Sequence, residues 1–255
     1  MMTFSFLKRF LKKEKELPDL IVNDQEFRLS FAEKKKNTLK YIICNGVKIP
    51  IDWNKVVLYN EEGGMGYTEG FKLVKKRRKP KMFVAHWDVC LDTRSMVVVT
   101  KKRGLSVHFG IDNDGTIYQL MDTNDIAYHA RGVNTTSVGV EIANGIYPRF
   151  QSYYKKSGFG PRNIIIGEKV HDKELAPYLG FYDVQIDAFN ALAKALGGEY
   201  DIPFKIPKDK NENLVDKVDP RVVGRSFRGI IGHFHLNPEK NDPGIDFFKR
   251  LMEKQ

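Results

Sequence analysis

Histidine and acidic side chains in three separated segments of the chain could form a metal site. His86 lies in the run MFVAHWDV, and His233 and Asp242 lie in IGHFHLNPEKNDPG near the end of the 255 residues. A catalytic zinc site commonly takes three protein ligands of these types and leaves a fourth position for water. The alternative is structural, because a strand-end histidine is usually a hydrogen-bonded polar residue and Asp before Pro-Gly commonly forms a turn.

The elements that would hold these residues are short strands and one helix. We interpret five β-branched or aromatic runs as strands of one sheet: MFVAHWDV, SVHFGID, TIYQL, SVGVEIAN and FRGIIGHF. A helix that ends at Gly197-Gly198 is predicted for FYDVQIDAFNALAKALGGEY. Its apolar face carries Val184, Ala188, Leu192 and Leu196. A helix that covers a sheet predicts an α/β domain over residues 82–255.

The region before this domain, residues 1–81, is basic. The chain has a formal net charge of +10, and its densest block, KLVKKRRKPK at Lys72–Lys81, has seven basic side chains and no acidic ones. Such a surface attracts a polyanion, for which we consider an anionic envelope polymer, a membrane surface or nucleic acid. Asn45-Gly46 between apolar runs predicts a hairpin. The region is expected to associate with wall or membrane, or to pack on the domain that follows.

Composition narrows the class of protein. The two cysteines, Cys44 and Cys90, are far apart and show no disulfide framework, which indicates synthesis in a reducing compartment. The N-terminal MMTFSFLKRFLKKEKEL is not predicted to be a secretory signal, because lysine and arginine interrupt its apolar residues. No apolar run approaches the roughly 20 residues of a membrane span. The connection from Ile146 to Phe181 is long and has no predicted role.

Taken together and in order, five segments carry a resemblance to a known family. FVAHWD, SVHFGIDNDGTIYQL, AYHARGVNTTSVGVEIAN, the helix with Gln185, and IIGHFHLNPEKNDPG resemble the zinc-dependent N-acetylmuramoyl-L-alanine amidases of type 2, which share their fold with peptidoglycan recognition proteins. The resemblance covers about residues 82–250. It implies a central mixed β-sheet flanked by helices, here with a basic N-terminal extension, and a monomer that binds one zinc ion.

The resemblance also implies a ligand set. His86, His233 and Asp242 match the zinc ligands of the family. His235 is a rival to His233, although the Gly-His pair at the strand end favours His233. Cys90, four residues after His86, is a weaker candidate ligand. His171, in the long connection, is expected to face solvent.

Two further residues match catalytic positions of the family. Glu141 in SVGVEIAN matches an acid that serves as the general base and acid, and a carboxylate in such a run is costly unless it is paired or functional. Lys240 precedes Asp242 by two residues and can stabilise the negative charge that grows on the carbonyl oxygen. Some family members place a tyrosine before the histidine of the second strand. This chain has Val107 there, which puts more weight on Glu141.

Two positions match the substrate groove of the family. His129 in AYHARG is expected to contact substrate, and Asn144 matches a position where the family often has asparagine. The resemblance therefore implies hydrolysis of the amide between N-acetylmuramic acid and L-alanine in peptidoglycan. We expect synthesis in the cytoplasm without a signal peptide and action on the cell wall, in phage lysis after the membrane has been permeabilised.

Three other functions compete with this one. A cytoplasmic amidase that recycles wall fragments would share the ligand set. A non-catalytic peptidoglycan-binding module on the same fold would have a damaged ligand set. A nucleic-acid-binding protein would use the Lys72–Lys81 block, but the chain has no zinc-finger, helix-turn-helix or RNP-type pattern and no specific nucleic acid is expected.

Overall fold

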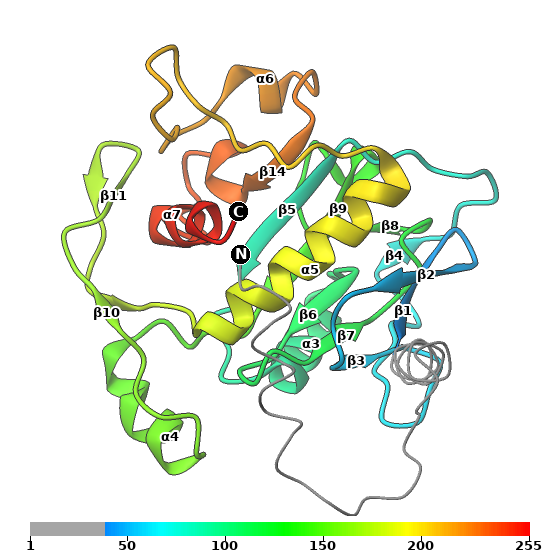
Figure 1. Ribbon diagram of the computed structural model, residues 1–255, viewed down its shortest axis with the longest axis horizontal. Coiled ribbons are helices and arrows are strands. Elements are labelled where there is room, and N and C mark those ends of the chain that lie inside the picture. Colours follow the sequence, from blue (N-terminus) through cyan, green and yellow to red (C-terminus); the bar gives the residue numbers. More distant parts are fainter. Residues whose placement is uncertain (1–38) are drawn as a thin grey trace, which may run out of the picture. The chain divides into compact units, whose positions relative to one another are not determined.

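A mixed sheet of six strands forms the centre of residues 39–255, the part of the chain that the structure, a computed structural model, describes (Figure 1). Its strands in spatial order are β14 (Gly229–Gly232), β5 (Met82–Trp87), β9 (Ser137–Ile142), β6 (Phe109–Ile111), β7 (Ile117–Gln119) and β3 (Val56–Val57). The first four are parallel, β7 is antiparallel to β6, and β3 is parallel to β7. All five runs predicted as strands lie in this sheet, which confirms the expected fold class.

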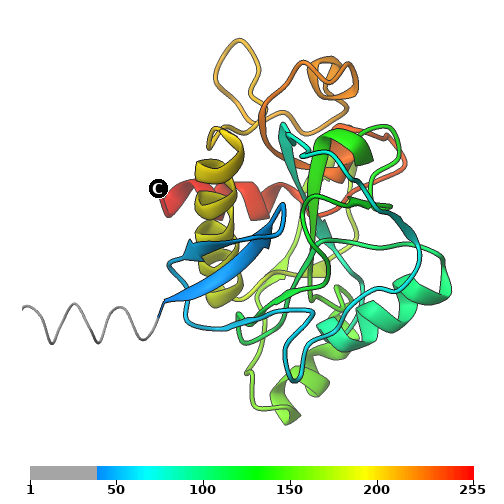
Figure 2. The ribbon, with the colours of Figure 1, turned by 90° about the vertical axis from the view of Figure 1, so that its right-hand side faces the viewer.

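Helices cover both faces of the sheet (Figure 2). On one face, α5 (Asp183–Tyr200) and α7 (Ile245–Glu253) build the main core, in which Phe189 stacks on Phe83 with ring centroids 4.8 Å apart. On the other face lies α3 (Thr93–Lys102). Strand β6 passes close under α3 because Gly110 has no side chain. A Cβ there would lie 2.4 Å from Cγ2 of Thr93.

Helix α5 confirms the predicted helix, with Ala188, Leu192 and Leu196 buried as predicted, but it ends at a different residue. It continues through Gly197-Gly198 to Tyr200, and Asp201 ends it in the left-handed conformation with φ of 55°. Tyr200 is buried and hydrogen-bonds Thr123, so a tertiary contact extends the helix beyond the glycine pair. Ile186 and Phe189 are fully buried, whereas Val184 is only half-buried.

The predicted hairpin is confirmed as β1 (Lys40–Cys44) and β2 (Val47–Ile51), joined by Asn45-Gly46 with φ of 53° and 75°. It packs against α5 and contributes Ile42 and Ile43 to the main core. The Gln119 side chain accepts from N–H of Ile43 and donates to its carbonyl, both at 2.7 Å. The compact unit that contains the sheet therefore begins at Leu39.

The basic block Lys72–Lys81 is fixed to the body of this unit. It begins at β4 (Phe71–Lys72), which pairs with β8 (Ile126–Ala127). Arg78 is buried, and its guanidinium donates to the carbonyls of Thr123, Asn134 and Ser137. Backbone and side-chain bonds to Asn124 and Asp125 hold the segment further. These bonds fix the block on the surface of the folded unit, so the block is not a solvated linker.

The long connection between β9 and α5 is ordered into short elements. They are η2 (Pro148–Phe150), α4 (Gln151–Lys156), β10 (Ile164–Ile165), β11 (Lys169–Val170), β12 (Lys173–Glu174) and β13 (Tyr178–Leu179). Arg162 ties the connection to the sheet, donating to carbonyl oxygens of Gly180 and Ala143 and to the side chains of Gln185 and Asn113. Its guanidinium also lies 4.1 Å from the ring centre of Tyr182.

Short helices complete the unit: η1 (Asn134–Thr136), α6 (Pro220–Val223) and η3 (His233–His235). Within residues 39–255, none of the helices is long and apolar enough to cross a membrane. The predictions made for the N-terminal arm fall on residues 1–38 and lie outside the described residues.

Candidate active site

The carboxyl ends of three neighbouring strands bring the candidate residues together. His86 at the end of β5 pairs in register with Glu141 on β9, so the two side chains point to the same face of the sheet. On the other side of β5, β14 ends at Gly232, which pairs with Ala85, and His233 follows directly. Alternate residues of β5 and β9, including Phe83 and Val140, face α5. The site therefore opens on the face that α3 covers.

His86, His233 and Asp242 form a cluster with the donor set of a metal site. The Oδ2 atom of Asp242 lies 2.8 Å from Nδ1 of His86 and 3.2 Å from Nδ1 of His233. One ligand atom from each residue falls within 4.8 Å of the others. Two imidazoles and one carboxylate, contributed by three segments and open on one side, fit an open catalytic zinc site.

A hydrogen-bond chain fixes the ring of His86. Ser137 Oγ donates to the carbonyl of Val133 at 2.9 Å, so it accepts from Nε2 of His129 at 3.1 Å. Nδ1 of His129 is then an acceptor for Nε2–H of His86 at 3.1 Å. This chain orients the ring so that Nδ1 of His86 faces Asp242, and a second residue usually orients a histidine ligand in this way.

Gly139 makes room for this chain. A Cβ at Gly139 would lie 2.5 Å from Nδ1 of His129, so only glycine lets the His129 ring lie against β9. His129 lines the cavity, as expected for a substrate contact, but its hydrogen bonds lead to His86 and Ser137. A substrate contact by His129 stays a prediction, and the geometry favours a role in holding His86.

Burial and mutual contacts set the protonation states of the cluster. Burial lowers the pKa of His86 and holds the pKa of His129 well below its usual range. Burial opposes ionisation of Asp242, but its interactions with the rings of His233 and His86 outweigh burial and lower the pKa of its carboxyl. A lowered pKa of His86 and of Asp242 favours the neutral imidazole and the ionised carboxylate, which are the forms that bind a metal.

His235, the rival ligand, points away from the cluster. The chain turns into η3 at His233, so the extended strand does not continue to His235. Nδ1 of His235 accepts from N–H of Gly232 at 2.9 Å, and Nε2 donates to the carbonyl of Val215 at 2.9 Å. Both ring nitrogens are used, and the side chain is fully buried. His233 is the residue that reaches Asp242.

Glu141 lies beside the cluster in a poorly solvated position. Its Oε2 atom is buried without a hydrogen-bond partner among the described residues. Burial raises the pKa of Glu141 well above its usual range, and the charges of Asp88 and Asp242 add to this effect. Lys240 and Arg103 act in the opposite direction. A buried carboxyl group with a raised pKa is a candidate for proton transfer.

Asp88 is a cavity residue that the sequence analysis missed. Its Oδ1 atom accepts from N–H of Cys90 at 2.9 Å and of Asn144 at 3.0 Å, while Oδ2 is buried without a partner among the described residues. Burial raises the pKa of Asp88 to about 8. The only signal in the sequence was an acid two residues after His86, which strand alternation alone would place on the same face.

Lys240 lies on the loop that carries Asp242, and the long connection holds this loop. Nε2 of His171 donates to the carbonyl of Lys240 at 3.0 Å. Glu168 accepts from backbone N–H groups of Ile245 and Asp246 at the start of α7, at 2.8 and 2.6 Å. The expectation that His171 faces solvent was wrong, because the connection folds back onto the loop.

Asn144 is placed next to the site but is fully buried. Its Nδ2 donates to the carbonyl of Leu179 at 2.6 Å, and its Oδ1 accepts from N–H of Ile146 at 3.0 Å. These bonds use the amide group to hold the backbone around the cavity. Substrate binding by Asn144 stays a prediction that this geometry does not favour.

A cavity of about 360 Å³ opens above the cluster. On the side of α3 its wall includes Met96, Val99, Thr100 and Arg103. Lys240 lines it from the loop that carries Asp242. Cys90 also lines it, but burial raises the pKa of this thiol to about 12, and the residue is not part of the metal cluster. The cavity thus gives access to the three candidate metal ligands, Glu141 and Lys240.

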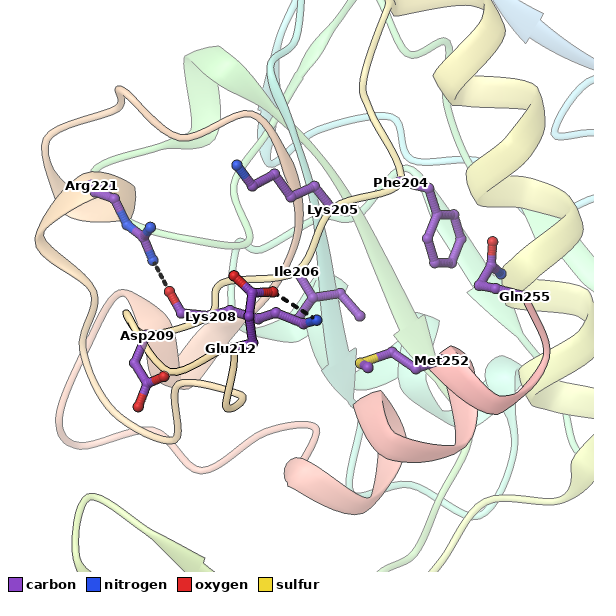
Figure 3. Close-up of a pocket in the computed structure, with 9 residues that line it drawn as sticks. All are labelled: Phe204, Lys205, Ile206, Lys208, Asp209, Glu212, Arg221, Met252 and Gln255. Carbon is purple, nitrogen blue, oxygen red and sulfur yellow. Dashed lines mark hydrogen bonds and ion pairs between the residues drawn. The ribbon is translucent and has the colours of Figure 1, made fainter.

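A second cavity, of about 420 Å³, lies between the 204–212 segment, α6 and the end of α7 (Figure 3). Lys208 pairs with Glu212 there, and Arg221 donates to the carbonyl of Lys208. Phe204, Ile206 and Met252 provide its apolar surface. Its nine lining residues include no histidine or cysteine, so the chemistry of the molecule is centred on the first cavity.

Several solved structures resemble the chain at low sequence identity. The amidase LysC from Clostridium intestinale URNW is 20% identical, with 78% of this chain and 96% of that chain covered and a TM-score of 0.46. The Ph2119 endolysin of a Thermus scotoductus bacteriophage is 14% identical, with 77% and 98% covered and a TM-score of 0.44. AmiD from E. coli, solved with the substrate anhydro-N-acetylmuramic acid-L-Ala-D-gamma-Glu-L-Lys, is 17% identical, with 70% and 60% covered and a TM-score of 0.43.

The family assignment rests on the sequence match, since these TM-scores are below 0.5. No curated protein matches the chain. The sequence model of the Amidase_2 family, described as N-acetylmuramoyl-L-alanine amidase, matches residues 76–245, well over half of the chain. The matched range contains the cluster, Glu141 and Lys240. The chain belongs to the N-acetylmuramoyl-L-alanine amidase family.

Proposed function

We propose that this protein hydrolyses the amide between N-acetylmuramic acid and L-alanine in peptidoglycan and that it uses one zinc ion. The observation that carries the proposal is the convergence of His86, His233 and Asp242 beside the buried carboxyl of Glu141 in one cavity. Zinc bound by these three residues would supply Lewis-acid chemistry, acidifying a water molecule and polarising the scissile carbonyl.

Glu141 is the proposed proton carrier. It takes a proton from the attacking water and later gives it to the nitrogen of the leaving L-alanine, which otherwise departs as an unstable anion. Burial, the main cause of the raised pKa of Glu141, makes its carboxylate a stronger base for the first step. No tyrosine competes for this role at the position before His108, where Val107 is buried.

Lys240 is the proposed stabiliser of the oxyanion. Its side chain lines the same cavity as Glu141 and the three ligands, and His171 holds its backbone carbonyl. As water attacks, negative charge grows on the carbonyl oxygen. An ammonium group in the cavity stabilises that charge more than it stabilises the neutral amide.

The test is digestion of purified peptidoglycan, with mass spectrometry of the products and metal analysis of the same protein sample. We expect stem peptides with a free L-alanine amino group, about one zinc ion per chain, loss of activity on chelation and recovery with zinc. Activity that is insensitive both to chelator and to His86→Ala would overturn the proposal. Binding without any cleavage would favour the non-catalytic module, although all three ligand positions are filled.

We also propose that the protein acts on intact wall, in the manner of a phage lytic enzyme, and that the basic strip Lys72–Lys81 holds it on anionic envelope polymers. Lys75, Lys76 and Lys79 are exposed and have no carboxylate partner within residues 39–255. Replacing these three lysines with serine should weaken sedimentation with wall sacculi while leaving turnover of a soluble muropeptide unchanged. Equal activity on both substrates with unchanged binding would instead favour a recycling amidase.

A further inference from the structure

Two β-branched residues on the cavity wall hold a backbone conformation that such residues rarely adopt. Val89 has φ of 55° and Ile146 has φ of 48°, both in the left-handed region where a branched side chain is strained. Both side chains line the cavity that contains His86 and Glu141. Strain of this kind persists only where the surroundings enforce it, and it gathers at functional sites.

One pair of side chains enforces both strained positions. Oδ1 of Asp88 accepts from N–H of Cys90, which closes a turn across Val89, and from N–H of Asn144. Asn144 in turn accepts from N–H of Ile146, whose carbonyl accepts from N–H of Leu179 at 2.6 Å. The hydrogen bond between Asp88 and N–H of Asn144 therefore joins two separate chain segments. One segment contains Val89 and the other contains Ile146.

The strained residues do little for the core. The side chain of Val89 is 42% exposed, and Ile146 is partly exposed, although both are large and apolar. Neither belongs to the hydrophobic clusters that stabilise the fold. Folding therefore gains little from their burial, while the cavity gains an apolar wall three residues beyond His86. Charged residues such as Arg103, Glu239 and Lys240 line other parts of the cavity.

We propose that Val89 and Ile146 form an apolar subsite for the methyl group of the L-alanine at the scissile amide. This inference rests on the proposed amidase function. The methyl group branches from the carbon bonded to the amide nitrogen, so it enters the cavity wherever that nitrogen is brought to the ligands and Glu141. Two branched side chains on a held backbone offer a methyl group an apolar contact.

The experiment compares kcat/KM for two soluble muramoyl peptides that differ only in having L-alanine or glycine as the first residue. One methyl group in an apolar pocket changes kcat/KM by roughly 10-fold or more, so we expect the wild type to prefer alanine by about that factor. Val89→Gly and Ile146→Gly should reduce the preference to near one through loss on the alanine substrate. Their melting temperatures should not fall, because glycine relieves the strain.

Arg225→Gly is the matched control. Arg225 also has positive φ, of 59°, but it is exposed and lies outside the cavity, so its replacement should leave the preference unchanged. Val89→Asn, which tolerates the left-handed conformation, removes the apolar contact without adding a glycine and should also lose the preference.

Two results would overturn the inference: an unchanged alanine preference in the folded variants, or an equal loss on both substrates, which would assign the two side chains to another part of the substrate. A wild type that cleaves neither peptide would instead overturn the proposed function.

Discussion

Two groups of histidines in this molecule differ in how their ring nitrogens are used. His108 and His235 are fully buried, and both nitrogens of each ring are bonded to backbone groups. His86 and His233 instead direct Nδ1 at one carboxylate oxygen, and they lie where a cavity opens. The comparison teaches that a candidate metal ligand differs from a structural histidine in having a ring nitrogen that faces other possible ligand atoms in a cavity. Burial and a position at a strand end do not make this distinction.

The largest expected effect on activity comes from replacing a residue of the cluster formed by His86, His233 and Asp242. His233→Ala or Asp242→Ala removes one of the three proposed ligands. We expect loss of bound zinc and a fall of more than about 100-fold in kcat/KM. This fall is larger than the roughly 10–100-fold decrease that is usual when a residue that only orients a ligand is replaced. Metal analysis and muropeptide cleavage measure the two effects. His235→Asn is the comparison, and zinc content retained in His233→Ala but lost in His235→Asn would reverse the assignment.

Glu141→Gln tests the proton carrier without removing a ligand. The amide is nearly isosteric with the carboxyl but cannot carry the proton, so kcat should fall by about 10²–10⁴-fold while zinc content stays near one. The buried, raised-pKa environment of Glu141 also accepts a neutral amide more readily than it accepts a carboxylate. Folding should therefore be preserved or improved in urea denaturation. A variant that keeps wild-type kcat would remove Glu141 from the mechanism.

His129→Ala sharpens the comparison by deleting the residue that holds His86. Without the acceptor for Nε2–H of His86, zinc affinity should fall by about 10–100-fold. Titration with a competing chelator measures the affinity. If His129 contacts substrate instead, KM rises at saturating zinc while zinc affinity stays at the wild-type value.

The smallest effect on activity is expected from pH acting on the structural group. Burial lowers the pKa of His235 to about 4 and that of His108 to about 3, both below the unfolded value of about 6.5. As pH falls, these two histidines therefore bind protons in the unfolded chain at a higher pH than in the folded protein. The stability from these two residues is complete above about pH 6.5 and is lost as pH decreases toward 4 and then 3, by about 1.4 kcal/mol per pH unit for each residue.

Urea denaturation at pH 7 and pH 5 measures this loss. His108→Gln should be less stable than the wild type at pH 7, because a buried bond to N–H of Gly139 is lost, yet it should lose less stability between the two pH values. An identical pH dependence in wild type and variant would mean that His108 does not titrate in this range.

Much of the fold could be predicted from the sequence because its elements have strong local patterns. The β-branched runs that form β5, β9 and β14 are buried on both faces of the sheet. Such runs predict strands from their own residues alone, without information on the strands that pair with them. The Asn45-Gly46 turn fixes its hairpin in the same local way. The resemblance to the amidase family then identified which histidines to compare.

The remainder depended on contacts between distant segments. The turn into η3 that separates His233 from His235 leaves no mark in the alternation of IGHFH. The bond from His171 to Lys240 joins residues 69 positions apart. The packing of residues 39–81 into the main core, through Ile42 and Ile43, is one of the alternatives that the sequence left open, because short apolar runs in a basic segment do not show which surface covers them. The strained conformations of Val89 and Ile146 follow from Asp88 and Asn144 and not from their own residue types.

Glu168 links the candidate metal site to the local stability of the connection between β9 and α5. Its carboxylate joins the start of α7 to Tyr178 of β13, just beyond the loop that presents Asp242. Any opening of residues 164–179 that breaks these bonds also loosens a ligand. A cation that binds only the closed arrangement must therefore suppress that opening. Protease resistance and amide exchange of residues 164–179, which contain none of the candidate ligands, would then show whether a cation is bound at the candidate site. The measurement needs no substrate.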